Sequence, residues 1–136
     1  MIIIDTHIWL WFLKADKRLG NSEIVDFLKK EQKKSGLRMA SISLWEISML
    51  AAKKRIVSDK NLKTWINDAL KLTNIKLINL NTDIAVDTYK LPGKFHGDPA
   101  DRIIVATARY LNAKLVTADK KIIEYADKGH LEVIEV

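Results

Sequence analysis

Five acidic residues in this sequence stand at positions from which they could act together. They are Asp5, Glu46, Asp98, Asp101 and Asp119. Carboxylate oxygens are the ligands that Mg²⁺ and Mn²⁺ prefer, and these ions keep several waters and accept substrate phosphate as a further ligand. Without a metal, clustered carboxylates would repel one another and some would protonate. The residue types therefore predict a metal site that acts on a phosphate group, provided that the fold brings the carboxylates together.

Other common chemistries are excluded or disfavoured by what the sequence lacks. With no cysteine, the chain has no thiol nucleophile, no cysteine-ligated zinc and no disulfide. The histidines His7, His96 and His130 do not have the paired spacing of zinc ligands. The glycine motifs of P-loop and dinucleotide-binding enzymes are also missing. The acidic residues are therefore the strongest candidates for a reactive site.

Each acid also has a purely structural interpretation. Asp98 before Pro99 fits a helix N-cap, and Glu46 with Ser43 fits a capping box. Asp5 and Asp119 could form turns. Glu46 is the hardest to explain in this way, because its helical neighbours at three and four positions are Ile42, Ser43, Met49 and Leu50, none of which can pair with its charge. A carboxylate among apolar side chains is costly unless it is paired, hydrogen-bonded or metal-bound.

The hydrophobic pattern predicts strands that alternate with helices. The strands are expected at 1–4, 37–40, 75–80, 114–117 and 131–136. The helices are expected at 6–14, between a turn at 20–22 and Gly36, and at 44–52, 61–72, 82–90, 98–111 and 119–127. Strands separated by helices predict an α/β/α fold with a central, mostly parallel sheet of four or five strands. The run at 1–4 has no polar alternation, so the first strand should be internal.

This topology places the acids at one edge of the sheet. In an open parallel sheet, the C-terminal ends of the strands and the N-termini of the following helices surround the crevice where ligands bind. Asp5 and Asp119 each follow a strand, whereas Glu46, Asp98 and Asp101 stand near helix starts. We therefore expect these carboxylates to line a single pocket.

Length and composition predict a single domain over residues 1–136. Of the 136 residues, 48% are hydrophobic and 29% charged, which supplies both a core and a solvated surface. The longest apolar run, residues 8–13, is far too short to span a membrane, and the first residues lack a basic region. We therefore expect neither a transmembrane helix nor a signal peptide. The absence of cysteine is compatible with a cytoplasmic location.

The charge balance suits a polyanionic partner such as RNA. The net charge is +6, and setting aside Asp5, Glu46, Asp101 and Asp119 leaves 13 acidic residues against 23 basic ones. The rest of the molecule thus carries a formal +10 around a pocket of −4. That distribution suits a polyanion that is held at the rim and cut in the centre.

Four sequence blocks resemble the signature blocks of PIN-domain ribonucleases, and within them the VapC-type toxins of bacterial and archaeal toxin–antitoxin pairs. The blocks are MIIIDTH (1–7), SISLWEI (41–47), HGDPADRIIVA (96–106) and LVTAD (115–119). The resemblance covers essentially the whole chain. It implies a PIN-like α/β/α domain and an endoribonuclease dependent on Mg²⁺ or Mn²⁺. It also implies an RNA substrate, inhibition by a small cognate antitoxin protein, and a homodimer.

The resemblance also implies roles for individual residues. By position, Asp5, Glu46, Asp101 and Asp119 match the catalytic acids that bind the metal. Supporting positions are matched by Thr6 and Thr117, whose hydroxyls could hydrogen-bond the acids, and by Asp98, which could cap its helix, face the site, or both.

Tryptophans near the expected site suggest where a partner could bind. Trp9 and Trp11 are two residues apart on one helix, so they point to different sides and cannot both be deeply buried. Apolar surface near Trp9, Trp11 and Trp45 could anchor an antitoxin that inserts a basic side chain among the acids.

Two other functions are weighed against the ribonuclease. A catalytically silent PIN-like module would bind RNA or protein without cutting, but the acids of the pattern are all present. A phosphatase with a nucleophilic aspartate on its first strand would need a second aspartate two residues after Asp5, where this chain has His7.

Overall fold

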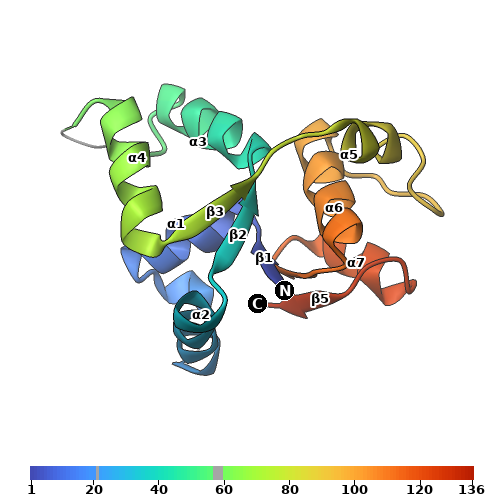
Figure 1. The fold of residues 1–136 in the computed structure, drawn as a ribbon, viewed down its shortest axis with the longest axis horizontal. Coiled ribbons are helices and arrows are strands. Elements are labelled where there is room, and N and C mark those ends of the chain that lie inside the picture. Colours follow the sequence, from blue (N-terminus) through green and yellow to red (C-terminus); the bar gives the residue numbers. More distant parts are fainter. Residues whose placement is uncertain (21, 57–59) are drawn as a thin grey trace.

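The computed structural model describes residues 1–20, 22–56 and 60–136 and contains a five-stranded parallel sheet (Figure 1). Its strands are β1 (Ile2–Ile4), β2 (Leu37–Ala40), β3 (Ile75–Ile78), β4 (Lys114–Thr117) and β5 (Val133–Glu135). The spatial order is β3-β2-β1-β4-β5, and each neighbouring pair is parallel. The α/β fold and the internal position of the first strand are confirmed.

Helices connect the strands in the alternation that the sequence predicts. They are α1 (Thr6–Lys14), α2 (Ser22–Lys34), α3 (Ile42–Ala52), α4 (Leu62–Thr73), α5 (Thr82–Asp87), α6 (Pro99–Leu111) and α7 (Lys120–Asp127). A short 3-10 helix, η1 (Lys17–Leu19), was not expected. Asn21, in the expected turn before α2, lies outside the described residues.

The core lies on both faces of the sheet. Ile2 and Ile4 of β1 pack on one face, in a cluster that includes Trp9 of α1, while Ile3 packs on the other face with Ile104 of α6. All three isoleucines of β1 are buried. This arrangement explains why the first strand is a continuous apolar run, and it produces the three layers of helix, sheet and helix.

Some helices and strands end or begin at other residues than predicted. One reason is that apolar residues that are exposed in the structure were counted as part of the predicted strands. Leu80 is half exposed and lies outside β3, which ends at Ile78. Asn81 already caps α5 by accepting a hydrogen bond from the backbone N–H of Ile84, at 2.8 Å. Helix α5 ends at Asp87 rather than at residue 90, and β5 begins at Val133 rather than at residue 131.

In the described part of the chain, no helix combines the length and apolar character that crossing a membrane requires.

Candidate active site

The five acids line one pocket at the C-terminal edge of the sheet. Asp5 follows β1, Asp119 follows β4, Glu46 lies on α3, and Asp98 and Asp101 stand at the start of α6. The cavity has a volume of about 260 Å³. Its other wall residues are His7, Trp11 and Ala118.

Asp5 is the most buried acid of the pocket and is held at both oxygens. Its side chain accepts hydrogen bonds from the backbone N–H of Thr6, at 2.7 Å, and from the hydroxyl of Thr117, at 2.8 Å. Burial raises the pKa of Asp5, and the two hydrogen bonds oppose that rise. The backbone N–H of Asp5 continues the sheet pairing by donating to the carbonyl of Val116. The carboxylate therefore has a fixed position at the bottom of the pocket.

Glu46 is oriented by a pair of buried hydroxyls. Thr6 Oγ1 donates to Glu46 Oε1 at 2.7 Å and also lies 2.7 Å from Ser43 Oγ. The single hydroxyl proton of Thr6 goes to the carboxylate, so Ser43 donates to Thr6. Burial raises the pKa of Glu46, and the hydrogen bond from Thr6 counteracts it. The capping-box interpretation is wrong, because α3 has Ser41 at its N-cap without a side-chain cap bond and the Ser43 hydroxyl faces α1.

Two other acids of the pocket are also helix caps. Asp98 caps α6 by accepting from the N–H of Asp101 at 2.9 Å, as expected for an acid before proline. Asp119 caps α7 by accepting from the N–H groups of Lys121 and Ile122, at 2.9 and 3.2 Å. A helix N-terminus favours an ionised carboxylate. Capping and pocket lining are therefore compatible at these positions.

Thr117 connects the two strand-end acids. Its hydroxyl donates to Asp5 and accepts from the backbone N–H of Asp119, at 3.0 Å. Since β1 and β4 are neighbours in the sheet, this one buried hydroxyl sets the spacing between the acids that follow them.

Asp101 is destabilised in its ionised form by burial and by the other acids of the pocket. Burial raises its pKa, and repulsion from Asp98, Asp119, Asp5 and Glu46 adds to the rise, which brings the value to about 7. A nearby cation would reverse this effect by favouring the ionised form.

The pocket has the donor chemistry of a hard-cation site without a preformed cage. Its acidic donors are all carboxylate oxygens, which suit Mg²⁺ and Mn²⁺. Within residues 1–20, 22–56 and 60–136, no three acidic or histidine side chains stand close enough together to enclose an ion. Mg²⁺ commonly binds through one or two carboxylates and several waters, and that mode does not require a preformed cage.

A tightly anchored segment, residues 88–97, leads into α6 and its acids. The side chain of Arg102 donates to the carbonyls of Thr88 and Phe95, at 2.9 and 2.8 Å. Tyr125 Oη donates to the carbonyl of Pro92 at 2.6 Å, and its ring contacts that of Phe95 edge-on. These contacts fix the chain where it enters α6.

Gly97 is required by this packing. A Cβ at this position would lie 2.3 Å from the Phe95 ring and 2.9 Å from Asp101 Cβ, closer than side-chain atoms approach one another.

Four residues at or near the site were not predicted from the sequence. Gly97 and Arg102 were not singled out, although both belong to block 96–106. His7 and Trp11 were not expected in the pocket wall. Their spacing of four residues on one helix was the available signal that they share a face.

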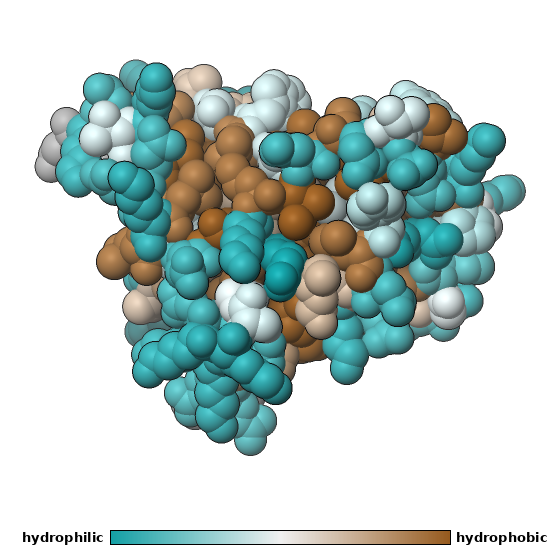
Figure 2. Space-filling model, viewed as in Figure 1, coloured by the Kyte–Doolittle hydropathy of each residue, from teal (hydrophilic) through white to brown (hydrophobic). Residues whose placement is uncertain are grey.

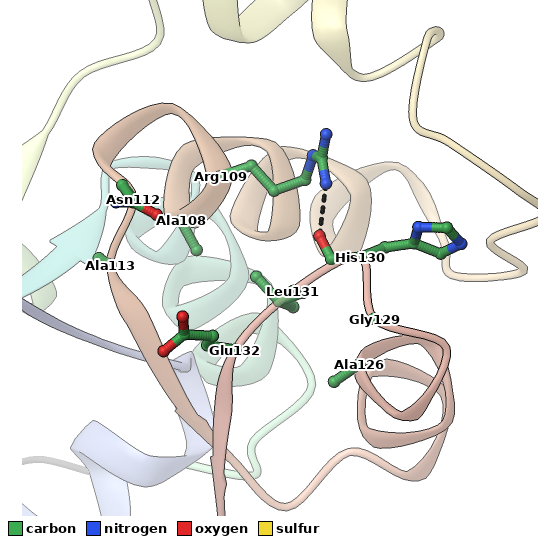
Figure 3. Close-up of a pocket in the computed structure, with 9 residues that line it drawn as sticks. All are labelled: Ala108, Arg109, Asn112, Ala113, Ala126, Gly129, His130, Leu131 and Glu132. Carbon is green, nitrogen blue, oxygen red and sulfur yellow. Dashed lines mark hydrogen bonds between the residues drawn. The ribbon is translucent and has the colours of Figure 1, made fainter.

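A larger cavity than the acidic pocket lies elsewhere in the described part of the chain. It is about 570 Å³ in volume and lies among the end of α6, the turn before β4, the end of α7 and the approach to β5 (Figure 3). Glu132 is the one acid among its lining residues, and the guanidinium of Arg109 donates to the carbonyl of His130. It contains none of the predicted site residues.

Comparison with known proteins identifies relatives over most of the chain. The model of the PIN domain family matches residues 2–128. Ribonuclease VapC22 of Mycobacterium tuberculosis is 27% identical over 121 residues, which cover 89% of this chain and 88% of that protein.

Solved structures confirm the fold. The VapBC2 complex of Rickettsia felis, bound to a DNA fragment from its promoter, contains a chain with a TM-score of 0.71 and 18% identity, covering 99% of this chain and 98% of that one. DNA-bound VapBC of Salmonella typhimurium contains another, with a TM-score of 0.70 and 16% identity, covering 98% and 96%.

Proposed function

The chain belongs to the PIN domain family, and from this premise we propose that it is a metal-dependent endoribonuclease that acts as the toxin of a toxin–antitoxin pair. The observation that carries the proposal is the meeting of acids from four separate elements in one pocket of a PIN domain. The relative named as a ribonuclease supports the choice of RNA as substrate.

Four of the acids are assigned to the metal. Asp5, Glu46, Asp101 and Asp119 would hold Mg²⁺ or Mn²⁺. The bound ion would supply Lewis-acid activation of water and of the scissile phosphate. Thr6 and Thr117 are supporting residues.

The protein groups around these acids have separate tasks in hydrolysis. Thr117 holds Asp5 at the bottom of the pocket, and Thr6 holds Glu46. Asp98 caps α6 and so fixes the backbone that carries Asp101. A pocket carboxylate accepts the proton of the attacking water, and the net positive charge of the chain attracts the RNA backbone.

An antitoxin is the proposed protein partner. The structural neighbours include VapBC complexes. In this chain, a groove of about 460 Å³ lies between α1 and α4 and includes Leu13, Trp65 and Leu72 in its lining. Figure 2 shows apolar residues gathered between α3 and α4 on the face in view. Trp45 is exposed and can contribute to an anchoring surface, whereas Trp9 is fully buried and cannot.

We further propose that residues 1–136 form one PIN domain, that the toxin acts in the cytoplasm and that it forms a homodimer.

An antitoxin would inhibit the toxin by laying an apolar segment in the groove between α1 and α4 and inserting a basic side chain among the pocket acids. Co-purification with the product of a neighbouring short reading frame, with loss of ribonuclease activity, tests this partner. A toxin that elutes alone and fully active would contradict it.

Cleavage assays test the enzyme directly. Wild-type protein is incubated with total RNA and with defined single-stranded RNAs in Mg²⁺ or Mn²⁺, and the reaction is repeated with chelator. Asp119→Asn should reduce cleavage by at least about 100-fold, since it removes a proposed metal ligand. Asp127→Asn is the matched control, because Asp127 is exposed at the opposite end of the same helix. Equal activity of Asp119→Asn and wild type would contradict the proposed site.

A catalytically silent binding module is the second candidate. The observation in its favour is the lack of a preformed cage among the described side chains. RNA binding without cleavage, unchanged by Mn²⁺, would support this alternative against the enzyme.

A further inference from the structure

We propose that the wall formed by His7 and Trp11 is a stacking site for the nucleobase beside the scissile phosphate. This inference rests on the proposed ribonuclease function and deepens it, because it names the residues that hold the RNA strand next to the acids. The sequence led us to consider Trp11 as a partner surface, and the structure instead places it in the wall of the acidic pocket.

The platform is a row of three planar groups. His7 and Trp11 both belong to α1 and line the pocket; their ring centroids lie 6.2 Å apart and their planes are tilted by 58°, so each ring presents its own face. The guanidinium of Arg18 lies over the Trp11 ring at 5.1 Å. His7 is exposed and Trp11 is partly exposed, so both can be reached from solvent.

Asp16 fixes the orientation of the third group. Arg18 donates to the Asp16 carboxylate through Nε at 3.1 Å and through Nη2 at 2.9 Å. This bidentate pairing restrains the guanidinium above the Trp11 ring and places a carboxylate beside its charge. The row therefore offers stacking surfaces rather than a free positive charge.

Nucleobases are the ligands that such a row recognises. Bases of single-stranded RNA stack on aromatic rings and on guanidinium planes, and this contact tolerates every base because each has a π-face. The acids occupy the same cavity, so a nucleotide whose phosphate lies at the acids has its base, or that of its neighbour, beside this wall.

An antitoxin segment fits this wall less well than a base does. The antitoxin proposed above needs an extended apolar surface for its segment, whereas this wall consists of two rings beside five carboxylates. The groove between α1 and α4 offers a separate apolar surface for a protein segment.

The test measures RNA binding and cleavage by variants of Trp11. Binding of a fluorescein-labelled single-stranded RNA is followed by anisotropy in a Glu46→Gln background, and cleavage kinetics are measured in the otherwise wild-type chain. Trp11→Leu should raise Kd and KM by roughly 5- to 150-fold, the range that corresponds to the loss of one stacked base, with a much smaller effect on kcat. Trp11→Phe keeps a ring and should retain most of the affinity.

Two controls separate stacking from a structural role. Tyr110→Leu removes an exposed ring near the far end of α6, roughly 13 Å along the helix from Asp101, and should leave Kd and KM unchanged. An RNA that is abasic beside the cleaved bond should bind wild type as weakly as Trp11→Leu binds intact RNA. Combining the abasic RNA with Trp11→Leu should then cause little further loss, because both changes remove the same contact.

Several outcomes would overturn the stacking site. Unchanged Kd and KM in Trp11→Leu, or fully additive losses with the abasic RNA, would show that no base stacks on Trp11. Unchanged RNA binding combined with a weakened antitoxin complex would assign the wall to the protein partner. Failure of the wild type to cut any RNA would contradict the proposed function, whereas the binding of intact RNA by the wild type, Trp11→Leu and Trp11→Phe chains would still decide the stacking site.

Discussion

At the scale of single residues, hydroxyl groups rather than cations stabilise the pocket acids. Asp5 is bound by Thr117, and Glu46 by Thr6. The ion pairs of the described residues involve other acids, namely Asp16, Asp68 and Asp87. A hydroxyl can hold a carboxylate in place without neutralising it, so the charge remains available for a metal ion.

Replacing Thr6 by valine should shift the pH dependence of the enzyme. The hydrogen bond from Thr6 lowers the pKa of Glu46, so its loss raises that pKa further. The acidic limb of the cleavage profile should move to higher pH, because Glu46 must then lose its proton at higher pH to bind the metal. Leaving Glu46 and Ser43 without this partner should also cost about 1–3 kcal/mol of stability.

Thr6→Ser is the control for that experiment, since it keeps the hydroxyl in the same buried position. Cleavage rates across the pH range and urea unfolding measure the two effects. An acidic limb at the same pH in wild type and in Thr6→Val would show that this hydroxyl does not tune Glu46.

Replacing Asp101 by asparagine should stabilise the metal-free protein at alkaline pH. The folded carboxyl has a pKa of about 7 against an ordinary value of 3.8, so the folded state holds this proton more tightly than the unfolded state. The contribution of Asp101 to stability therefore falls as the pH rises from about 4 to about 7 and stays low above that range. Thermal melts in chelator should show the advantage of Asp101→Asn at pH 8 and its disappearance near pH 4. A variant less stable than wild type at pH 8 would contradict this account.

At the scale of elements, the start of α6 is positioned by the segment that precedes it. Arg102 and Tyr125 bind the backbone of residues 88–95, and Gly97 lets the chain pass between the Phe95 ring and Asp101. Asp98 then caps the helix. The place of Asp101 in the pocket thus depends on contacts made by α6 and α7.

Replacing Gly97 by alanine should displace this segment and weaken catalysis. The added Cβ would overlap Phe95 and Asp101, which we expect to cost about 1–3 kcal/mol and to lower the cleavage rate at a given metal concentration. Thermal unfolding and cleavage rates measure the two effects. The second change Phe95→Leu, which removes the overlapping ring atoms, should restore part of the rate. Full activity in Gly97→Ala would show that the segment does not position Asp101.

At the scale of the whole molecule, a negative pocket lies in a positively charged chain. The chain carries a net +6, yet five acids line one cavity. Among the described residues, no ion pair joins these acids to a basic side chain, and His7 is the one basic residue of the pocket wall. Folding therefore places like charges together, and a divalent cation should relieve the resulting strain.

Mg²⁺ or Mn²⁺ should accordingly raise the melting temperature of the wild type at pH 8. A ligand that binds only the folded state at about ten times its Kd stabilises it by about 1.4 kcal/mol, or a few degrees in a domain of this size. Asp119→Asn should lose most of this shift, and Asp127→Asn should keep it. Equal shifts in both variants would place the ion outside the pocket.

The sequence by itself determined the alternation of strands and helices, the internal first strand and the edge of the sheet where the acids meet. These features depend on local patterns: a continuous apolar run at 2–4, helix-capping signals such as Asp98 before Pro99, and the rule that parallel strands end at one edge. The element boundaries were less certain, since an exposed residue such as Leu80 looks the same in a sequence as a buried one.

The tertiary structure alone decided which side chains meet. Thr6 contacts Ser43 and Glu46, which are 37 and 40 residues away, and Thr117 contacts Asp5 across 112 residues. It also decided that Trp9 is buried while Trp11 lines the pocket. Such pairings are set by the order and register of the strands and by the packing of helices on the sheet, and local sequence periodicity carries no information about either.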